Sequence, residues 1–150
     1  MTAYEHAFTM EEVYTWLGRQ QARYIRYGFG LWALLDAGTG AFVGQVGLTM
    51  QETPHGPELE IGYLLKRRFW HNGYASRAAA VCRDFAFSQM DAPRVVSIIR
   101  DTNEASKRVA ERTGLRPEYA FVKHYYGVDM PHIVYVLRRE DWLLKGKHSL

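Results

Sequence analysis

Trp70-His71-Asn72-Gly73-Tyr74-Ala75-Ser76 is the point at which a strand pattern becomes a helical pattern. Residues 59–65 before it are mostly apolar, as in a buried strand, and the residues after Gly73 are rich in alanine. Gly73 removes a side chain at the bend, and the first N–H groups of a helix have no intrahelical acceptor, so they are available to an anion. The sequence therefore predicts a strand, a phosphate-binding turn and a helix.

A second junction of the same kind follows. Residues 94–99 form an apolar, β-branched run. Asp101-Thr102-Asn103-Glu104-Ala105-Ser106 then opens a helix with Asn103 as its N-cap, and Gly114 follows the last turn. Two consecutive strand-to-helix junctions indicate a βαβ unit, in which the two strands run parallel.

Further elements flank this unit on both sides. Thr9-Met10-Glu11-Glu12 has capping-box spacing and begins an amphipathic helix that ends at Gly28. Apolar runs separated by turn residues predict two hairpins, one joining residues 31–35 to 41–49 before a loop at 51–57, and one joining 119–126 to 133–138. The predicted fold class is α/β, with a mixed, mostly antiparallel sheet, a central parallel βαβ unit and helices on both faces.

The composition is typical of an ordinary globular domain. With 150 residues and 47% hydrophobic content, the chain is predicted to form one domain, 1–150, with a flexible tail at 145–150. The net charge of +3 favours anionic ligands in general, without indicating nucleic acid or a membrane. The lone cysteine, Cys82, allows no internal disulfide, and the sequence contains no run of about 18 apolar residues that would span a membrane. We therefore expect a cytoplasmic protein.

Together these motifs resemble the GNAT superfamily of acetyl-CoA-dependent N-acetyltransferases, and within it the branch that acetylates alanine or serine N-termini of ribosomal proteins. The resemblance runs from about Thr9 to Trp142. Its specificity comes from the order and spacing of the motifs, since a glycine turn before a helix occurs in many α/β proteins. The motifs are Gly44-Gln45-Val46-Gly47, Glu60-Ile61-Gly62-Tyr63, the turn at 70–76, Asn103-Glu104-Ala105-Ser106 and Glu111-Arg112-Thr113-Gly114-Leu115.

Three positions depart from the pattern of this superfamily. The turn begins with Trp70 and His71 where members usually have Gln or Arg and then Gly, although the aromatic residue is similar to the ribosomal-protein branch. Ala110 stands where many members carry a tyrosine as general acid, which implies another acid or water. Eight residues precede the helix at Thr9, so the N-terminal strand and helix of the superfamily are expected to be missing.

The resemblance implies that acetyl-CoA binds at the turn and between the two parallel strands. Main-chain N–H groups of the turn would hold the pyrophosphate, supported by the Ser76 hydroxyl and by the charge of Arg68 or Arg77. The pantetheine arm would contact main-chain groups of the first strand, where the two strands separate. The residues assigned to acetyl-CoA are Tyr63, Leu65, Arg68, His71, Asn72, Gly73, Tyr74, Ala75, Ser76 and Asn103. The alternative is that Gly73 and Asn103 only begin ordinary helices and that both strands pair fully.

Two side chains are candidates for catalysis. A protonated amine must lose a proton before it attacks a thioester, so a carboxylate near the acetyl carbon is useful. Strand alternation puts Glu60 on the same face as Gly62, which leaves space beside it. The resemblance also implies a base at Glu60 and a proton donor for the departing thiolate at Ser106. The alternatives are a solvated or structural Glu60 and a Ser106 that only faces a helix groove.

Three functions are compatible with these features. The first is an N-acetyltransferase in which acetyl-CoA and a primary amine, such as a protein N-terminus, bind together and the amine attacks directly. The second is a non-catalytic acyl-CoA sensor, motivated by Ala110. A nucleic-acid-binding domain ranks last because the Lys and Arg residues are scattered. No metal is predicted, since the six histidines lack ligand spacing, and no membrane partner is predicted; a homodimer is compatible with the sequence.

Overall fold

The computed structural model describes residues 9–125 and 127–148. Its sheet has six strands in the order β1-β2-β3-β4-β6-β5, in which β3 and β4 are parallel and the other neighbours are antiparallel. The strands are β1 (Leu31–Leu35), β2 (Phe42–Thr53), β3 (Gly56–Leu65), β4 (Arg94–Arg100), β5 (Arg116–Tyr125) and β6 (Val128–Arg138). The helices are α1 (Met10–Tyr27), α2 (Tyr74–Ser88), α3 (Glu104–Arg112) and α4 (Arg139–His148), with a 3-10 turn at Arg67–Phe69. The predicted mixed α/β fold is confirmed.

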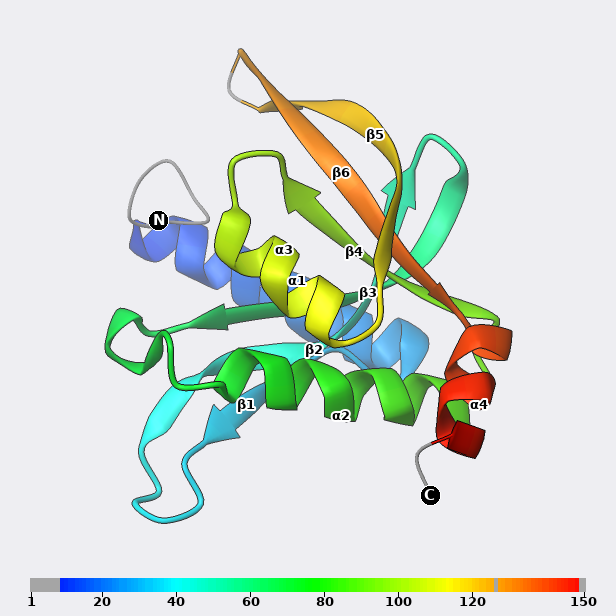
Figure 1. Ribbon diagram of the computed structural model, residues 1–150. Helices are drawn as coiled ribbons and strands as arrows, with labels where there is room; N and C mark the ends of the chain where they lie inside the picture. The colour runs from blue at the N-terminus through cyan, green and yellow to red at the C-terminus, as the bar shows by residue number, and fades with distance from the viewer. Residues whose placement is uncertain (1–8, 126, 149–150) are drawn as a thin grey trace.

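The sheet separates two apolar clusters. Helices α2 and α3 lie on one face and α1 lies on the opposite face (Figure 1). The larger cluster joins the sheet to α2 and α3 and includes Phe87, Val109 and Leu115. The smaller cluster lies on the face toward α1. Its members are Val96, Val134 and Val136, with Ile98, Tyr119 and Phe121 packed against them. Because side chains of a strand alternate between faces, β4 and β6 contribute to both clusters.

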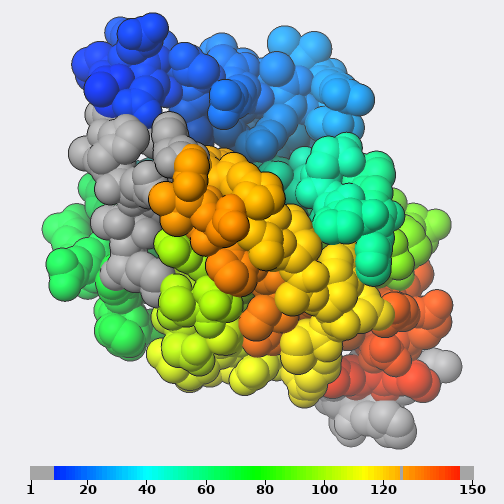
Figure 2. Space-filling model, turned by 90° about the horizontal axis from the view of Figure 1, so that it is seen from above, coloured from blue at the N-terminus to red at the C-terminus, as the bar shows by residue number. Residues whose placement is uncertain are grey.

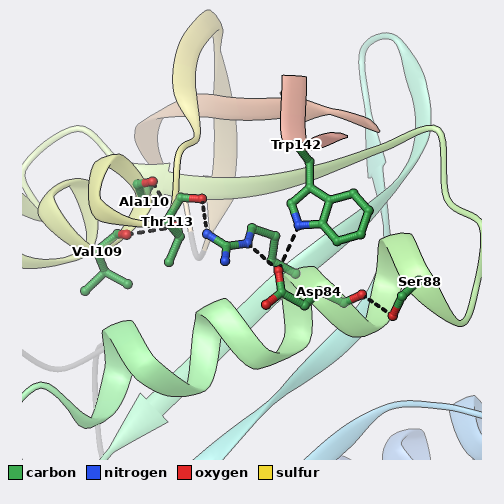
Figure 3. Close-up of polar contacts among 7 residues, drawn as sticks. Asp84, Ser88, Val109, Ala110, Thr113 and Trp142 are labelled. Atoms are coloured by element: carbon green, nitrogen blue, oxygen red, sulfur yellow. Dashed lines mark hydrogen bonds and ion pairs between the residues drawn. The ribbon is translucent and has the colours of Figure 1, made fainter. Parts of the chain in front are cut away.

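The C-terminal half of α2 is tied to α3 and α4 by polar contacts (Figure 3). Arg83 donates from Nη1 to the carbonyl oxygen of Thr113 at 2.8 Å and from Nε to Asp84 at 2.9 Å. The indole of Trp142 donates to the same Asp84 carboxylate at 2.9 Å. These bonds fix the axis of α2, and therefore the position of its N-terminus.

Two connections between strands are shorter than the sequence predicts, because strands extend into the predicted loops. The loop prediction at 51–57 is wrong, because β2 continues to Thr53 and β3 begins at Gly56. Pro57 is accommodated because it pairs with β2 before β4 joins β3, so no neighbouring strand needs its missing N–H. Likewise, β6 begins at Val128 and contains Pro131, which lies just beyond the last residue pair of β4 and β6.

The ends of the chain are described only in part. Residues 145–148 of the predicted tail belong to α4, and 149–150 lie outside the described residues. The expected absence of an N-terminal strand and helix concerns residues 1–8, which also lie outside, as does Tyr126. None of the described helices is long and apolar enough to cross a membrane.

Candidate active site

The turn before α2 has a backbone that is typical of anion sites. His71 and Gly73 both adopt the left-handed conformation, with φ angles of 63° and 77°. Glycine adopts this conformation freely, whereas a residue with a side chain is strained there by about 1 kcal/mol. Left-handed residues in a turn are characteristic of the backbone concavities that bind anions through main-chain N–H groups.

The N–H groups of this turn are open, while the carbonyl groups of Trp70, Asn72 and Gly73 accept hydrogen bonds. Within the described part of the chain, the main-chain N–H groups of residues 71–76 donate to no acceptor. Asn72 Nδ2 donates to the carbonyl of Trp70 at 3.0 Å, and the Arg77 guanidinium donates to the carbonyls of Asn72 and Gly73 at 3.4 Å each. Asn72 and Arg77 therefore bond to carbonyl oxygens of the turn and leave its N–H groups available to an anion.

A contact to the β1–β2 turn holds the first residue of α2. The Tyr74 hydroxyl donates to Asp36, whose carboxylate also accepts the N–H groups of Gly38 and Thr39 at 2.9 Å each. The hydrogen bond from Tyr74, followed by those from Thr39, lowers the pKa of Asp36 to about 2. Arg68 is exposed and lies over the Phe69 ring at 4.7 Å, so it is near the turn without bonding to it.

The parallel strands β3 and β4 separate almost as soon as they meet. Their ladder consists of one residue pair, Glu60 with Val96. Two side chains replace the ladder beyond this pair: Ser97 Oγ donates to the carbonyl of Ile61 at 3.0 Å, and the Ile98 N–H donates to Glu60 Oε2 at 2.7 Å. A gap therefore opens between β3 and β4 on the C-terminal side of Glu60.

The main chain of β3 borders this gap. The Ile61 carbonyl points toward β4, since it accepts the Ser97 hydroxyl, and strand alternation turns the main-chain groups of Tyr63 and Leu65 the same way. The Leu65 carbonyl is already bonded to the Trp70 indole N–H at 3.0 Å. Tyr63 therefore offers both main-chain groups to the gap, whereas Leu65 offers only its N–H.

Glu60 occupies the point of separation, on the face toward α1. Its half-buried side chain has Gly62 beside it, where an added Cβ would lie 4.0 Å from Glu60 Oε1, so the predicted space is present. Desolvation raises the pKa of Glu60 to about 7, although the Ile98 N–H and the charges of Lys123 and Arg23 act in the opposite direction. The carboxyl group is thus close to half ionised near neutral pH.

Ser106 lies at the same gap but on the other face of the sheet. Asn103 caps α3 by accepting the Ser106 N–H at 3.1 Å, and the Tyr63 hydroxyl donates to the Ser106 carbonyl at 3.4 Å. The Ser106 hydroxyl has no hydrogen bond to another described residue. Ala110 is 3% exposed and packs in the core. The structure therefore brings Ser106 next to β3, but not into contact with Glu60.

Two contributors to the site were missed in the sequence, Ser97 at the gap and Asp36 beside the turn. Ser97 is a lone polar residue in an apolar strand, and that interruption was an available signal. The tie between Asp36 and Tyr74 joins segments 38 residues apart and leaves no such signal. Among the described residues, no three His, Cys, Asp or Glu side chains gather as a possible metal site.

An apolar groove elsewhere on the molecule is separate from this site. It has a volume of about 610 Å³ and lies between β1, β2 and α2. It is lined by Trp32, Leu34, Val46, Ala78, Val81, Cys82 and Phe85. These side chains offer no acid, base or anion-binding group. Burial raises the pKa of the Cys82 thiol to about 11, so it is not a nucleophile near neutral pH.

Comparison with known proteins identifies the family. Residues 1–116 match the acetyltransferase (GNAT) domain. The chain belongs to the GNAT acetyltransferase family. The GNAT protein is therefore an acetyltransferase, and enzymes of this family use acetyl-CoA as cosubstrate.

Individual relatives agree with this assignment. The GNAT protein is 36% identical to the protein YkkB of Bacillus subtilis over 77% of this chain and 67% of that protein. It is 29% identical to the FsC-acetyl coenzyme A-N(2)-transacetylase of Aspergillus fumigatus, over 100% of this chain and 68% of that enzyme. The structure of a ribosomal-protein-S5-alanine acetyltransferase from Vibrio fischeri superimposes with a TM-score of 0.73 at 22% identity, covering 93% and 80% of the two chains. That last likeness shows a shared fold.

Proposed function

We propose that the GNAT protein transfers the acetyl group of acetyl-CoA to a primary amine in a ternary complex, with Glu60 as the general base. The observation that carries this proposal is the gap between β3 and β4. The unpaired N–H groups of residues 71–76 lie beyond one end of this gap, and the Glu60 carboxyl group, with a pKa of about 7, lies at the other end. Glu60 and Leu65 are five residues apart on β3, a distance of about 17 Å along an extended strand. An extended pantetheine arm suits this separation.

The residues along the gap fit acetyl-CoA, which supplies the acetyl group as a thioester. The open N–H groups of His71, Asn72, Gly73, Tyr74, Ala75 and Ser76 would hold the pyrophosphate at the N-terminus of α2. The N–H and carbonyl groups of Tyr63, the N–H of Leu65 and the side chain of Asn103 would hold the pantetheine amides. Arg68 would add positive charge beside the turn.

Glu60 suits the removal of a proton from an ammonium group. A base is most effective when its pKa is near the working pH, and that of Glu60 is about 7. The Ile98 N–H holds Oε2 in place at 2.7 Å. Oε1 faces the open space at Gly62. The carboxylate can therefore accept a proton without breaking its bond to β4.

Ser106 is our candidate for the proton donor to the thiolate that leaves. Its hydroxyl is uncommitted, and Asn103 and Tyr63 fix its main chain at the gap. Among primary amines, we propose a protein N-terminus as acceptor, as the shared fold with a ribosomal-protein alanine acetyltransferase suggests.

A cytoplasmic location belongs to the same proposal. The single cysteine, Cys82, is buried and forms no disulfide, which is compatible with a reducing compartment. Cell fractionation with an antibody against the GNAT protein would test it, and recovery outside the cytoplasm would contradict it.

Two measurements test the proposed reaction. Titration calorimetry should show acetyl-CoA binding at submillimolar concentration, and acetyl transfer should follow with a panel of amines and peptide N-termini. Glu60→Gln should bind acetyl-CoA and lose transfer. A non-catalytic acyl-CoA sensor would bind equally well but would show no activity for Glu60→Gln to remove. Absence of acetyl-CoA binding would overturn the proposal.

A further inference from the structure

Two half-buried cations without ionic partners belong to the face that carries Glu60. Arg23 comes from α1 and Lys123 from β5, and neither forms an ion pair with any described residue. Arg23 is held in place by a bond of 3.1 Å from Nη1 to Gln20 Oε1, and Gln20 is 7% exposed. Burial of Gln20 therefore fixes the direction of the guanidinium.

The strand register places Lys123 on this face. Tyr119 and Phe121 pack, as Ile98 does, against the smaller apolar cluster, and Lys123 follows two residues later on the same side of β5. The Glu60 carboxylate is bonded to the main chain of the same Ile98. Figure 2 shows α1 in blue along this side, with the β5–β6 hairpin near the turn of β2 and β3, where His55 stacks on Tyr119 at 4.0 Å.

Arg23 and Lys123 make the electrostatic potential in front of Glu60 more positive. The positive charges of Lys123 and Arg23 both lower the pKa of Glu60, so both side chains act on the space that its carboxyl group faces. A protonated amine that approaches Glu60 is therefore repelled by two charges and attracted by one. An uncompensated cation close to this space weakens binding of a second cation on the order of tenfold in a protein-like dielectric. A negative group on the acceptor offsets this repulsion.

We infer that the acceptor carries a carboxylate close to the amine that is acetylated, and that Arg23 and Lys123 bind this carboxylate. The inference rests on the proposed acetyl transfer to a primary amine. An acidic peptide would narrow the proposed N-terminal acceptor, whereas a free amino acid would replace it. A free amino acid and a peptide with an acidic residue at its N-terminus both supply this chemistry. Polyamines and amines flanked by neutral groups do not.

Matched acceptors test the inference. Initial rates of acetyl transfer would be measured with phenylalanine and phenylalanine amide, with the dipeptide amides Asp-Ala and Asn-Ala, and with 1,4-diaminobutane. We expect kcat/KM to be about tenfold higher or more for the carboxylate-bearing member of at least one pair, and the diamine to be the poorest acceptor. The pair that shows the preference identifies an amino acid or an acidic peptide.

Variants identify the groups responsible. Arg23→Gln and Lys123→Gln should each reduce the ratio of kcat/KM for the preferred carboxylate acceptor to kcat/KM for its neutral partner by about 5-fold to 30-fold. The neutral partner loses a repulsion in these variants, so its own kcat/KM should not fall. Arg19→Gln, which removes an exposed charge of the same helix, is the matched control and should change neither. Thermal melting would check folding, and Lys123→Gln leaves the buried Gln20 contact intact.

The outcomes separate this inference from the proposed function. Fastest transfer to 1,4-diaminobutane, or equal rates within both pairs, would overturn the inference while the acetyltransferase proposal stands. An equal loss for charged and neutral acceptors in the Arg23 and Lys123 variants would also overturn it. Absence of transfer to every amine, with acetyl-CoA bound, would overturn the proposed function and the inference together.

Discussion

Helices α1 and α2 lie on opposite faces of the same sheet, but they are held in different ways. α2 has 15 residues and buries Ala78, Ala79, Cys82, Ala86 and Phe87. α1 is longer, with 18 residues, yet among its described residues Gln20 alone is buried and Ile25 is 87% exposed. Burial of apolar surface, and not helix length, therefore makes the α2 side the firmer of the two.

The difference matches the two tasks that we propose for the site. The donors for a pyrophosphate must stay in one geometry, and α2 is fixed by the core and by the contacts of Arg83. α1 is attached by few contacts, including the Tyr24 hydroxyl, which donates to the Leu31 carbonyl. The acceptor side can therefore adjust while the acetyl-CoA side does not, and the residues at the gap connect the two.

The largest expected effect falls on Glu60, where the two sides meet. Glu60→Gln keeps an oxygen for the Ile98 N–H but cannot accept a proton. At pH 8, kcat/KM should fall by about 10²-fold to 10⁴-fold, while the Kd of acetyl-CoA stays within about twofold. Glu52→Gln, an exposed carboxylate on β2, is the control. A comparable loss of acetyl-CoA binding in Glu60→Gln would mean that Glu60 is a structural link between β3 and β4.

The pH dependence of stability gives the next largest effect. The pKa of Glu60 is raised from 4.5 to about 7, so the folded state holds this proton more tightly than the unfolded state. The resulting stability is fully present below pH 4.5 and is lost as the pH rises through about 7, a change of up to about 3 kcal/mol.

Replacing Glu60 by glutamine should remove this dependence. Chemical denaturation at pH 5, 6, 7 and 8 should show a free energy of unfolding that falls less steeply in Glu60→Gln than in the parent protein. Parallel curves would show that Glu60 titrates as an ordinary solvated carboxyl group and is not a base tuned to neutral pH.

The α2 side was the more predictable from sequence. The turn at 70–76 could be placed because glycine, alanine and a change of hydrophobic period act locally. The capping box of α1 and the Asn103 cap of α3 were predicted for the same reason, and the structure contains both. Local signals of this kind do not depend on which strands become neighbours.

The gap itself depended on long-range contacts that sequence patterns do not encode. Ser97 and Ile61, like Ile98 and Glu60, meet only after β4 has docked beside β3. The prolines led to the wrong loop prediction at 51–57, because their effect depends on whether another strand lies alongside, as at Pro57. Arg23 and Lys123 appeared as scattered charges until the fold placed them on one face.

The attachment of α2 to its neighbours should affect stability more than acetyl-CoA binding. Arg83→Ala leaves the carbonyl of Thr113, a residue that is 3% exposed, without its donor, and should cost about 1–3 kcal/mol of unfolding free energy. Ser88→Ala removes a bond of 2.6 Å from the exposed end of the same helix and should cost no more than about 0.5 kcal/mol. Equal costs would show that the Arg83 contacts do not hold α2 in place.

A small loss of stability and a specific loss of acetyl-CoA binding are expected at Gly73. Its φ is 77° and an added Cβ would meet nothing closer than Arg77 Nε at 4.0 Å, so Gly73→Ala should cost about 1 kcal/mol through backbone strain alone. Gly127 has a φ of 74° in the β5–β6 turn, with open space around it, so Gly127→Ala should cost a similar amount. Only Gly73→Ala should also weaken acetyl-CoA binding, by about 5-fold to 10-fold, because relaxation of the strained turn would redirect its N–H donors. Equal Kd values for the two variants in titration calorimetry would show that the turn does not bind the pyrophosphate. The rigidity of the α2 side would then not serve acetyl-CoA binding.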